Sequence, residues 1–245
     1  MLQSIKPYKK DHNYSYTLGV FLTIELLIHK PEKVLSVILS SQAEKNTGVT
    51  KIIELCELNS IPVEVNDRII ARLSPKENCY ALGILEKYTL AVEPHKNHVV
   101  LVNPMDSGNL GTIFRTCLGF GIKNLAIIRP SVDPFDPKTI RASMGALFSV
   151  NFTQFDHFQS YMEQYPGQEL YPFMLEAKKS LHDVETFMKS PFSLVFGNES
   201  SGLPAEFSRY GTSVVIPHSN DIDSLNLSMA VGLALYSFTK QNFSH

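Results

Sequence analysis

The spacing of apolar and polar residues along the chain predicts two α/β domains of different size. From His98 onwards, short apolar runs of strand length alternate with amphipathic runs at helical spacing. This alternation is typical of a mostly parallel sheet covered by helices on both faces. We therefore predict an α/β domain over residues 96–245. The expected strands are 98–103, 124–130, 147–153, 169–176, 193–198 and 213–217; the expected helices are 109–121, a short one within 136–146, 157–165, 204–210 and 225–241.

The N-terminal part follows the same rhythm on a smaller scale. Apolar residues at helical spacing predict a helix over 13–30, which Pro31 ends. Further runs predict strands at 34–39, 61–65 and 79–85 and a helix at 49–59. We expect a small α/β sandwich over residues 1–90. The patterning lapses over residues 88–98, which therefore form the predicted linker.

Composition narrows the class of protein. Apolar residues make up 44% of the 245 residues, which is enough to bury a core. No apolar run approaches the ~18 residues of a membrane helix, and the N-terminus lacks an apolar signal core. We expect a soluble cytoplasmic protein without a membrane partner. The three cysteines are far apart and form no CxxC, so neither a disulfide framework nor a metal site is predicted.

Charge limits what the chain can bind. The net charge is −2, with eleven Lys/Arg and ten Asp/Glu in residues 1–90 against eleven and fourteen in residues 91–245. A nucleic-acid binder often has a basic excess, so any RNA footprint here must be local. The one dense basic run is Lys6, Lys9 and Lys10 around Tyr8. Taken alone, such a run indicates a solvated N-terminal tail.

Three polar loops follow predicted strands, at 103–109, 197–204 and 217–226, where parallel sheets bind ligands. In the first, Gly108, Asn109 and Gly111 open a helix, which is suited to a phosphate, yet the spacing is neither GxGxxG nor a P-loop. Arg115 lies six residues after Asn109, which is nearly two helical turns, at the margin of an apolar face. It is suited to an interface, with a surface ion pair as the alternative.

The second and third loops favour a pocket. Gly197 and Gly202 imply close backbone approach or positive φ, with a tight turn and a solvated Glu199 as the simpler alternative. In the third loop, either Ser224 or Asp223 is predicted to cap a helix that begins at Leu225. Seven polar residues are more than capping needs. We therefore expect this loop to form a wall around a polar ligand. The seven polar residues of this loop are His218, Ser219, Asn220, Asp221, Asp223, Ser224 and Asn226.

Taken together, these loops resemble the SpoU/TrmH family of RNA 2′-O-ribose methyltransferases, in the SPOUT superfamily. The first motif is NLGTIFRT (109–116), the second LVFGNESSGL (194–203), and the third IP at 216–217 followed by SLNLSMA (224–230). The segment KTIRASMGALF (138–148) also resembles this family. The likeness covers about residues 96–241. More loosely, the N-terminal part resembles the small α/β RNA-binding domain of several ribosomal proteins, best over TLGVFLTIELL (17–27).

The resemblance implies a fold with a deep trefoil knot and S-adenosyl-L-methionine as cofactor. It implies a homodimer through the first and last helices of the catalytic domain, with Arg115 reaching the partner's pocket. The N-terminal domain would recognise RNA, ribosomal in preference to transfer RNA. The implied catalytic residues are Arg115, Asn109, Glu199, Ser224 and Asn226, and the implied cofactor-binding residues are Phe196, Gly197, Ile216 and Leu225. No metal is implied.

Three other functions stay open on sequence alone. An RNA-binding pseudoenzyme would keep the fold without turnover, although every motif residue is present. A SPOUT enzyme that methylates a base is disfavoured by the SLN of the third motif, on resemblance only. A nicotinamide-dependent oxidoreductase is disfavoured because the chain lacks GxGxxG and an acidic residue after the following strand.

Overall fold

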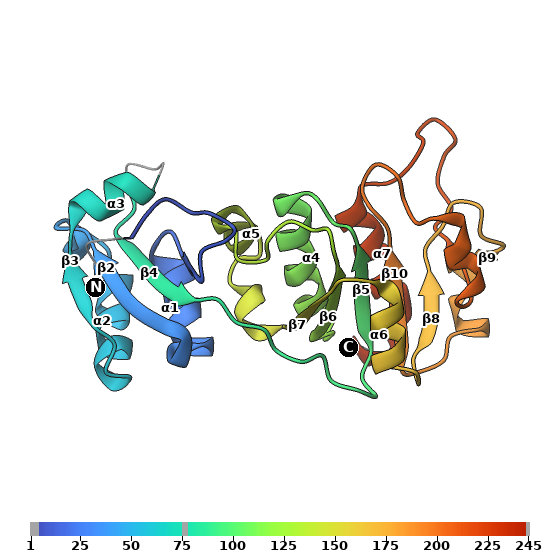
Figure 1. Cartoon of the computed structure of the whole chain (residues 1–245), viewed down its shortest axis with the longest axis horizontal. Coiled ribbons are helices and arrows are strands. Elements are labelled where there is room, and N and C mark those ends of the chain that lie inside the picture. Colours follow the sequence, from blue (N-terminus) through green and yellow to red (C-terminus); the bar gives the residue numbers. More distant parts are fainter. Residues whose placement is uncertain (1–4, 75–77, 244–245) are drawn as a thin grey trace. The chain divides into compact units, whose positions relative to one another are not determined.

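The computed structural model describes residues 5–74 and 78–243, which form two compact units (Figure 1). The first unit combines the chain up to Tyr88 with Asp133–Ser149, and the second combines Thr89–Val132 with the chain from Val150 onwards. The segment 133–149 therefore packs with the N-terminal residues, although its sequence neighbours on both sides belong to the second unit.

The first unit is a four-stranded sheet with helices on both faces. The sheet order is β1-β4-β2-β3, in which only the β2–β3 pair is parallel. The strands are β1 (Tyr14–Tyr16), β2 (Val34–Leu39), β3 (Val63–Val65) and β4 (Ala81–Glu86). The helices are α1 (Val20–His29), α2 (Gly48–Leu58), α3 (Asp67–Leu73) and α5 (Pro137–Ala142), with 3₁₀ turns at Pro31–Lys33, Ala43–Lys45 and Ala146–Ser149.

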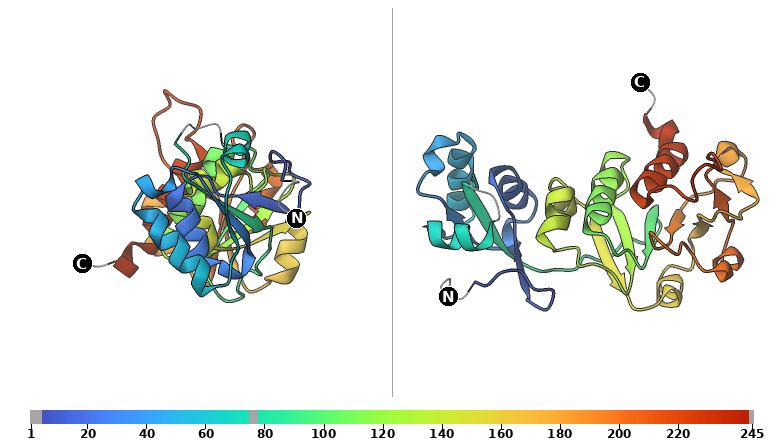
Figure 2. Two further views of the ribbon diagram at one scale, coloured as in Figure 1. Left: turned by 90° about the vertical axis from the view of Figure 1, so that its left-hand side faces the viewer. Right: turned by 90° about the horizontal axis from the view of Figure 1, so that it is seen from above.

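Alternating residues of this sheet feed two separate cores. Val37, Leu39 and Ala81 pack against α1 and α2, which lie side by side on one face (Figure 2). Ile38 and Leu82 point the other way, into a core that α3 and the N-terminal segment complete. Because both faces of β2 and β4 are buried, these two strands are short apolar runs in the sequence, which is why they were predicted.

The first predicted helix is wrong in its N-terminal third. Tyr14–Tyr16 form a strand that pairs antiparallel with β4, and the helix begins only at Val20. Gly19, at φ 105°, makes the break between them. The tyrosines at 14 and 16 are compatible with a strand as well as with a helix, and pairing with β4 decides the outcome. Helix α3 was not predicted, because a helix of seven residues carries too little periodicity.

The second unit is built on a five-stranded parallel sheet, as predicted. Its order is β7-β6-β5-β10-β8, and every pair is parallel. The strands are β5 (His98–Val102), β6 (Asn124–Ile128), β7 (Asn151–Phe155), β8 (Glu169–Pro172) and β10 (Phe192–Phe196), and β9 (Lys179–Ser180) and β11 (Val214–Val215) form a separate pair. The helices are α4 (Ser107–Gly119), α6 (Phe158–Gln164) and α7 (Leu227–Thr239), with 3₁₀ helices at Leu181–Thr186, Ala205–Arg209 and Lys240–Phe243.

Both faces of this sheet are covered, which confirms the predicted arrangement. Val100 and Val102 of β5 lie in a core with Phe158 and Tyr161 of α6. On the opposite face, Phe114 of α4 stacks edge-on against Phe152 of β7, and α4 packs against α7. The predicted strand 213–217 is shortened to β11 and lies outside the main sheet. The predicted strand 147–153 begins only at Asn151, after a 3₁₀ turn.

A buried polar network lies at the amino ends of β5 and β10. The His98 ring is fully buried; its Nδ1 lies 2.8 Å from the Tyr161 hydroxyl, and its Nε2 lies 2.8 Å from the Glu93 carbonyl. The Tyr161 hydroxyl in turn lies 2.6 Å from the Ser193 hydroxyl. Burial lowers the pKa of His98 below its usual 6.5, although the Glu93 carbonyl opposes this shift. The ring is therefore held neutral near pH 7.

This network predicts loss of stability in mild acid. In the unfolded chain His98 takes up a proton near pH 6.5, whereas in the folded protein it resists protonation. Its contribution is therefore present above pH 6.5 and is lost as pH falls, by at most about 1.4 kcal/mol per pH unit. Denaturant unfolding between pH 7 and pH 5 should show a smaller slope with pH in His98→Gln. The exposed His157→Gln is the matched control and should keep the native slope.

None of the helices in the described part of the chain has the length and apolar character that crossing a lipid bilayer requires. Within those same residues, no cluster of three or more His, Cys, Asp or Glu side chains is arranged to hold a metal ion. Cys56, Cys79 and Cys117 are buried thiols that form no disulfide.

Candidate functional site

The second polar loop folds back on itself at the end of β10. Asn198 and Gly202 exchange backbone hydrogen bonds of 3.2 and 2.9 Å. A Cβ on Gly197 would lie 2.1 Å from the carbonyl carbon of Gly202, and Gly202 itself has φ +64°. Only glycine permits both the close approach and the positive φ. The two glycines therefore serve both purposes that the sequence left open.

Glu199 is anchored to the first loop. Its carboxylate accepts hydrogen bonds from the backbone N–H groups of Met105 and Asp106, each at 3.1 Å. It also accepts a longer one, 3.5 Å, from the Asn109 side-chain amide. The alternative of a solvated Glu199 is therefore wrong. This half-buried carboxylate holds the ends of β5 and β10 together.

Asn109 connects this pair to the third loop. Its side-chain oxygen accepts a 3.0 Å hydrogen bond from the Nδ2 of Asn226. Asn226 also caps α7, since its Oδ1 accepts the backbone N–H groups of Ser228 and Met229 at 2.9 and 3.3 Å. The predicted cap at Ser224 or Asp223 is therefore wrong, because α7 begins at Leu227 and not at Leu225. Asn226 therefore both caps α7 and bonds to Asn109 of the first loop.

The two bonds of Asn226 can be separated by mutation. Asn226→Asp keeps the capping oxygen but removes the amide that donates to Asn109, whereas Asn226→Ala removes both. We expect the alanine variant to lose about 1 kcal/mol of unfolding free energy and the aspartate variant to lose less. Chemical denaturation measures this difference. Equal losses in both variants would mean that the cap contributes little and that the Asn109 contact dominates.

A cavity of about 470 Å³ opens beside these loops. Before the third loop, Val214 bridges to Phe173 beyond the end of β8, and both residues line the cavity. Of the predicted residues, Phe196, Gly197, Glu199, Ile216, Ser224 and Leu225 line the cavity. Asn109, Arg115 and Asn226 are not among its lining residues. The structure therefore gathers the predicted cofactor-binding residues into one pocket and puts part of the predicted catalytic set outside it.

Several of the polar residues at the start of the third loop make hydrogen bonds within that loop. His218 Nδ1 lies 2.8 Å from the carbonyl of Ile216, and the Ser219 hydroxyl donates to the Asp221 carboxylate. These local contacts shape the turn. Asp223 and Ser224, further along, are the ones that line the cavity with His218.

Arg115 is exposed on the surface of α4. The buried side of this helix is made by Leu110, Ile113, Phe114 and Cys117, which supports the predicted position at the margin of an apolar face. No ion pair or hydrogen bond of Arg115 occurs among the described residues, so the alternative of a surface ion pair is not supported within them.

Sequence reasoning missed Asn198 and Glu176. The Asn198 amide donates 2.8 Å to the carbonyl of Asn103, and its oxygen accepts from Ser200 N–H at 2.9 Å. An Asn two residues before a Ser in a turn is an Asx-turn signal and could have revealed it. Glu176 lines the cavity from the segment after β8, and its sequence neighbours carry no comparable signal.

A parallel α/β sheet whose strand-end loops enclose a pocket of this size is the architecture of an enzyme that uses a small-molecule ligand. Residues 96–236 match the family model described as SpoU rRNA Methylase family. This match covers more than half of the chain. The chain belongs to the SpoU rRNA methylase family.

Individual relatives extend the likeness beyond this region. A 23S rRNA (guanosine-2′-O-)-methyltransferase RlmB of Acinetobacter baylyi is 26% identical over 247 residues, covering 92% of this chain and 97% of its own. The structure of an AdoMet-bound rRNA methyltransferase from Sinorhizobium meliloti superposes with a TM-score of 0.79 at 25% identity, covering 95% and 89% of the two chains. A structure concerned with 2-OH methylation of C/U34 on tRNA is 31% identical with a TM-score of 0.54, covering 61% of this chain and 98% of its own.

Proposed function

We propose that this protein is an S-adenosyl-L-methionine-dependent RNA methyltransferase that modifies a ribose 2′-hydroxyl. The observation that carries the proposal is the pocket that the loops after β10 and β11 line, with the asparagine–glutamate network beside it. Membership of the SpoU rRNA methylase family supports the reaction class.

The lining of the pocket fits the cofactor. Phe196, Ile216 and Leu227 supply apolar walls for a flat heterocycle. Glu176 and Asp223 are carboxylates at the same pocket, and none of its described lining residues is a lysine or an arginine. A negative lining is complementary to a ligand that carries sulfonium and ammonium charges. Gly197, Ile216 and Leu225 would hold the cofactor largely through backbone groups, within a trefoil knot of the chain.

When bound, S-adenosyl-L-methionine supplies an electrophilic methyl group. The task of the protein is then to orient the ribose 2′-hydroxyl, which is a weak nucleophile at neutral pH, and to help it lose its proton. Arg115 performs this task best as a fixed positive charge, because a guanidinium stays protonated in proteins. Its charge lowers the pKa of a neighbouring hydroxyl, and its fork of donors clamps the adjacent phosphate.

The asparagine–glutamate network would present the remaining polar groups. Glu199 orients Asn109 through the bond between their side chains, and Asn109 in turn holds Asn226. Ser224 lines the pocket and is placed to donate a hydrogen bond to ligand or phosphate. Glu199, Asn109 and Asn226 each bond to a side chain or backbone group of another loop, so this part of the constellation is organised before substrate arrives.

Arg115 would act on the pocket of a second copy of the chain. It does not line its own pocket, and among the described residues that do line it there is no lysine or arginine. Helix α7, which packs on α4, exposes apolar side chains that suit a homodimer interface. Met229, Leu233 and Tyr236 are 58%, 40% and 60% exposed. Sedimentation of the purified protein should give the dimer mass; a monomer with full activity would contradict assembly in trans.

We propose ribosomal RNA in preference to transfer RNA as substrate, with residues 1–90 as the recognition domain of the catalytic domain 96–245. The relative that aligns over nearly the whole chain is named for 23S rRNA, whereas the tRNA-related structure covers 61% of it. An enzyme acting on ribosomal RNA would work in the cytoplasm.

Radiolabelled S-adenosyl-L-methionine and unmodified total RNA test the reaction. We expect the RNA to become labelled. Mapping of the labelled RNA should locate the label in a ribose 2′-O-methyl group. Cofactor binding without RNA labelling would overturn the catalytic proposal and favour a binding protein of the same fold. Label on a base would overturn the ribose assignment.

A further inference from the structure

The N-terminal basic run is part of a built surface. Ile5 is buried in the core that α3 covers, so the chain from residue 5 onwards packs on the first unit. The backbone N–H of Lys6 donates 3.0 Å to the Tyr14 hydroxyl, and that of Tyr8 donates 2.9 Å to the Tyr16 hydroxyl. The prediction of a solvated tail is therefore wrong for residues 5–11.

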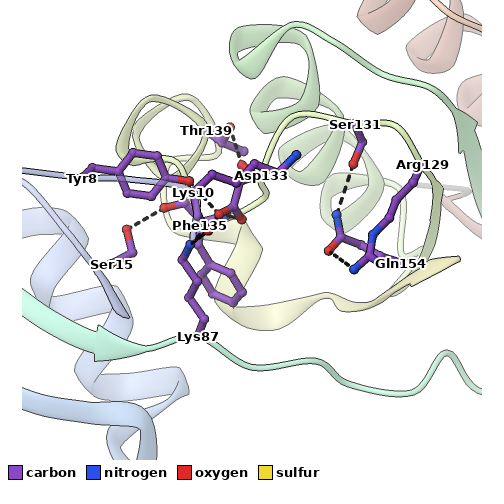
Figure 3. Close-up of polar contacts among 10 residues, drawn as sticks. All are labelled: Tyr8, Lys10, Ser15, Lys87, Arg129, Ser131, Asp133, Phe135, Thr139 and Gln154. Atoms are coloured by element: carbon purple, nitrogen blue, oxygen red, sulfur yellow. Dashed lines mark hydrogen bonds and ion pairs between the residues drawn. The ribbon is translucent and has the colours of Figure 1, made fainter. Parts of the chain in front are cut away.

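Contacts with Asp133 and Lys87 also hold this segment (Figure 3). The Tyr8 hydroxyl donates 2.6 Å to the Asp133 carboxylate, which also forms a 2.6 Å ion pair with Lys87. Lys87 donates 2.9 Å to the Lys10 carbonyl, and its ammonium lies 5.0 Å from the centre of the Tyr8 ring. These contacts use tyrosines and Lys87 to order the backbone, and they leave the side chains of Lys6 and Lys9 exposed.

Helix α3 extends this positive surface. Arg68 and Arg72 are four residues apart, so they lie on the same side of α3, and both are exposed. The opposite side of the helix, Ile69, Ile70 and Leu73, packs in the core that Ile5 and Tyr8 also join. We call residues 5–11 together with α3 the basic face. Among the described residues, no carboxylate pairs with Lys6, Lys9, Arg68 or Arg72.

Charge is segregated between the two faces of this unit. The basic face carries five Lys/Arg and two Asp, of which Asp67 is engaged by the Ser40 hydroxyl and the Ser41 N–H. Helices α1 and α2, on the other side of the sheet, carry three Glu and one Lys. A near-neutral unit of this kind has one side that attracts a polyanion and one that repels it.

We propose that the basic face is the surface on which the first unit receives the RNA backbone, and that the α1–α2 face stays free of RNA. This inference rests on the proposed function for the identity of the polyanion. Phosphate contact is the expected mode, because guanidinium groups bind phosphate bidentately and lysines neutralise its charge. Ordering of the backbone by Tyr14, Tyr16 and Lys87 reduces the entropy lost when the lysines engage.

The test compares single neutralising substitutions on the two faces. Lys9→Gln, Arg68→Gln and Arg72→Gln remove charges from the basic face, and Lys51→Gln removes an exposed lysine from α2. The probe is a fluorescein-labelled ribosomal RNA stem-loop, with affinity measured by anisotropy over a salt series. Each basic-face variant should bind several-fold more weakly, and its log–log salt slope should fall by about 0.7–0.9. Lys51→Gln should bind as the unaltered protein does.

Calorimetric affinity for S-adenosyl-L-methionine separates this inference from the proposed function. Unchanged cofactor affinity in all four variants shows that the pocket of the second unit is intact, and circular dichroism of each variant checks that the first unit is folded. RNA labelling by the unaltered protein, with salt slopes unaffected by basic-face substitutions, would overturn only the assignment of the face. An equal effect of Lys51→Gln would also overturn it, since net charge alone would then explain the result. Failure of the unaltered protein to bind RNA would overturn both.

Discussion

Replacing Arg115 with alanine is expected to abolish methyl transfer and to leave cofactor affinity nearly unchanged. The guanidinium does not line the pocket of its own chain and makes no described contact that supports the fold. If its charge stabilises the reacting hydroxyl, its loss should reduce the single-turnover rate at least about a hundredfold. Arg115→Lys keeps the charge but not the planar fork, and we expect it to recover only part of the rate.

Controls distinguish chemistry from assembly. Arg209→Ala removes another exposed arginine of the same unit and should keep full activity. If Arg115 acts in the partner's pocket, mixing Arg115→Ala with a pocket-defective Glu199→Ala variant should restore activity, because each mixed dimer contains one intact site. Absence of complementation between variants that demonstrably exchange subunits would mean that Arg115 acts within its own chain. Loss of dimer mass in Arg115→Ala would instead assign the residue to assembly.

Replacing Gly197 with alanine is expected to remove both cofactor binding and stability. The added methyl group would lie 2.1 Å from the carbonyl carbon of Gly202 and 2.3 Å from the N–H nitrogen of Leu203. Both obstacles are backbone, so no side chain can rotate away. The loop must open, which we expect to cost about 3 kcal/mol of unfolding free energy or more. Its opening also displaces Glu199, and with it the link to the first loop.

Calorimetry with the cofactor and denaturant unfolding measure the two effects separately. Gly167→Ala is the matched control, because a Cβ at that position meets no atom within 4 Å. It should leave both affinity and stability unchanged. A stable Gly197→Ala variant with native cofactor affinity would contradict the tight loop, since the chain would then have room that the structure does not give it.

Local pattern was sufficient for most of the catalytic fold. Strands β5, β6 and β10 are buried on both sides and therefore read as continuous apolar runs, which allowed the parallel sheet to be predicted. The order of those strands was not predictable, because it depends on contacts between segments far apart in sequence. Pairing with β4 likewise made Tyr14–Tyr16 a strand where helical spacing favoured a helix.

The candidate site divides in the same way. Glycines and small polar residues after strands marked the loops, since strand-end loops of parallel sheets are where ligands bind. The bonding partners of these side chains could not be predicted from the sequence. Glu199 bonds to Asp106, 93 residues away, and Asn226 bonds to Asn109, 117 residues away. The position of the α7 cap was missed by two or three residues for a local reason, because Asp223, Ser224 and Asn226 can each serve as an N-cap.

The sequence by itself determined the parallel sheet, the three loops and most of the residue types that line the pocket, because each depends on periodicity or on the chemistry of a few neighbouring residues. Only the tertiary structure decided which polar side chains meet, that Arg115 is apart from its own pocket, and that Lys6 and Lys9 project from an ordered segment. Those outcomes depend on contacts such as Tyr8 with Asp133, which are 125 residues apart in the chain. No local pattern contains that information, since the free energy of such a contact arises only when the fold brings both residues together.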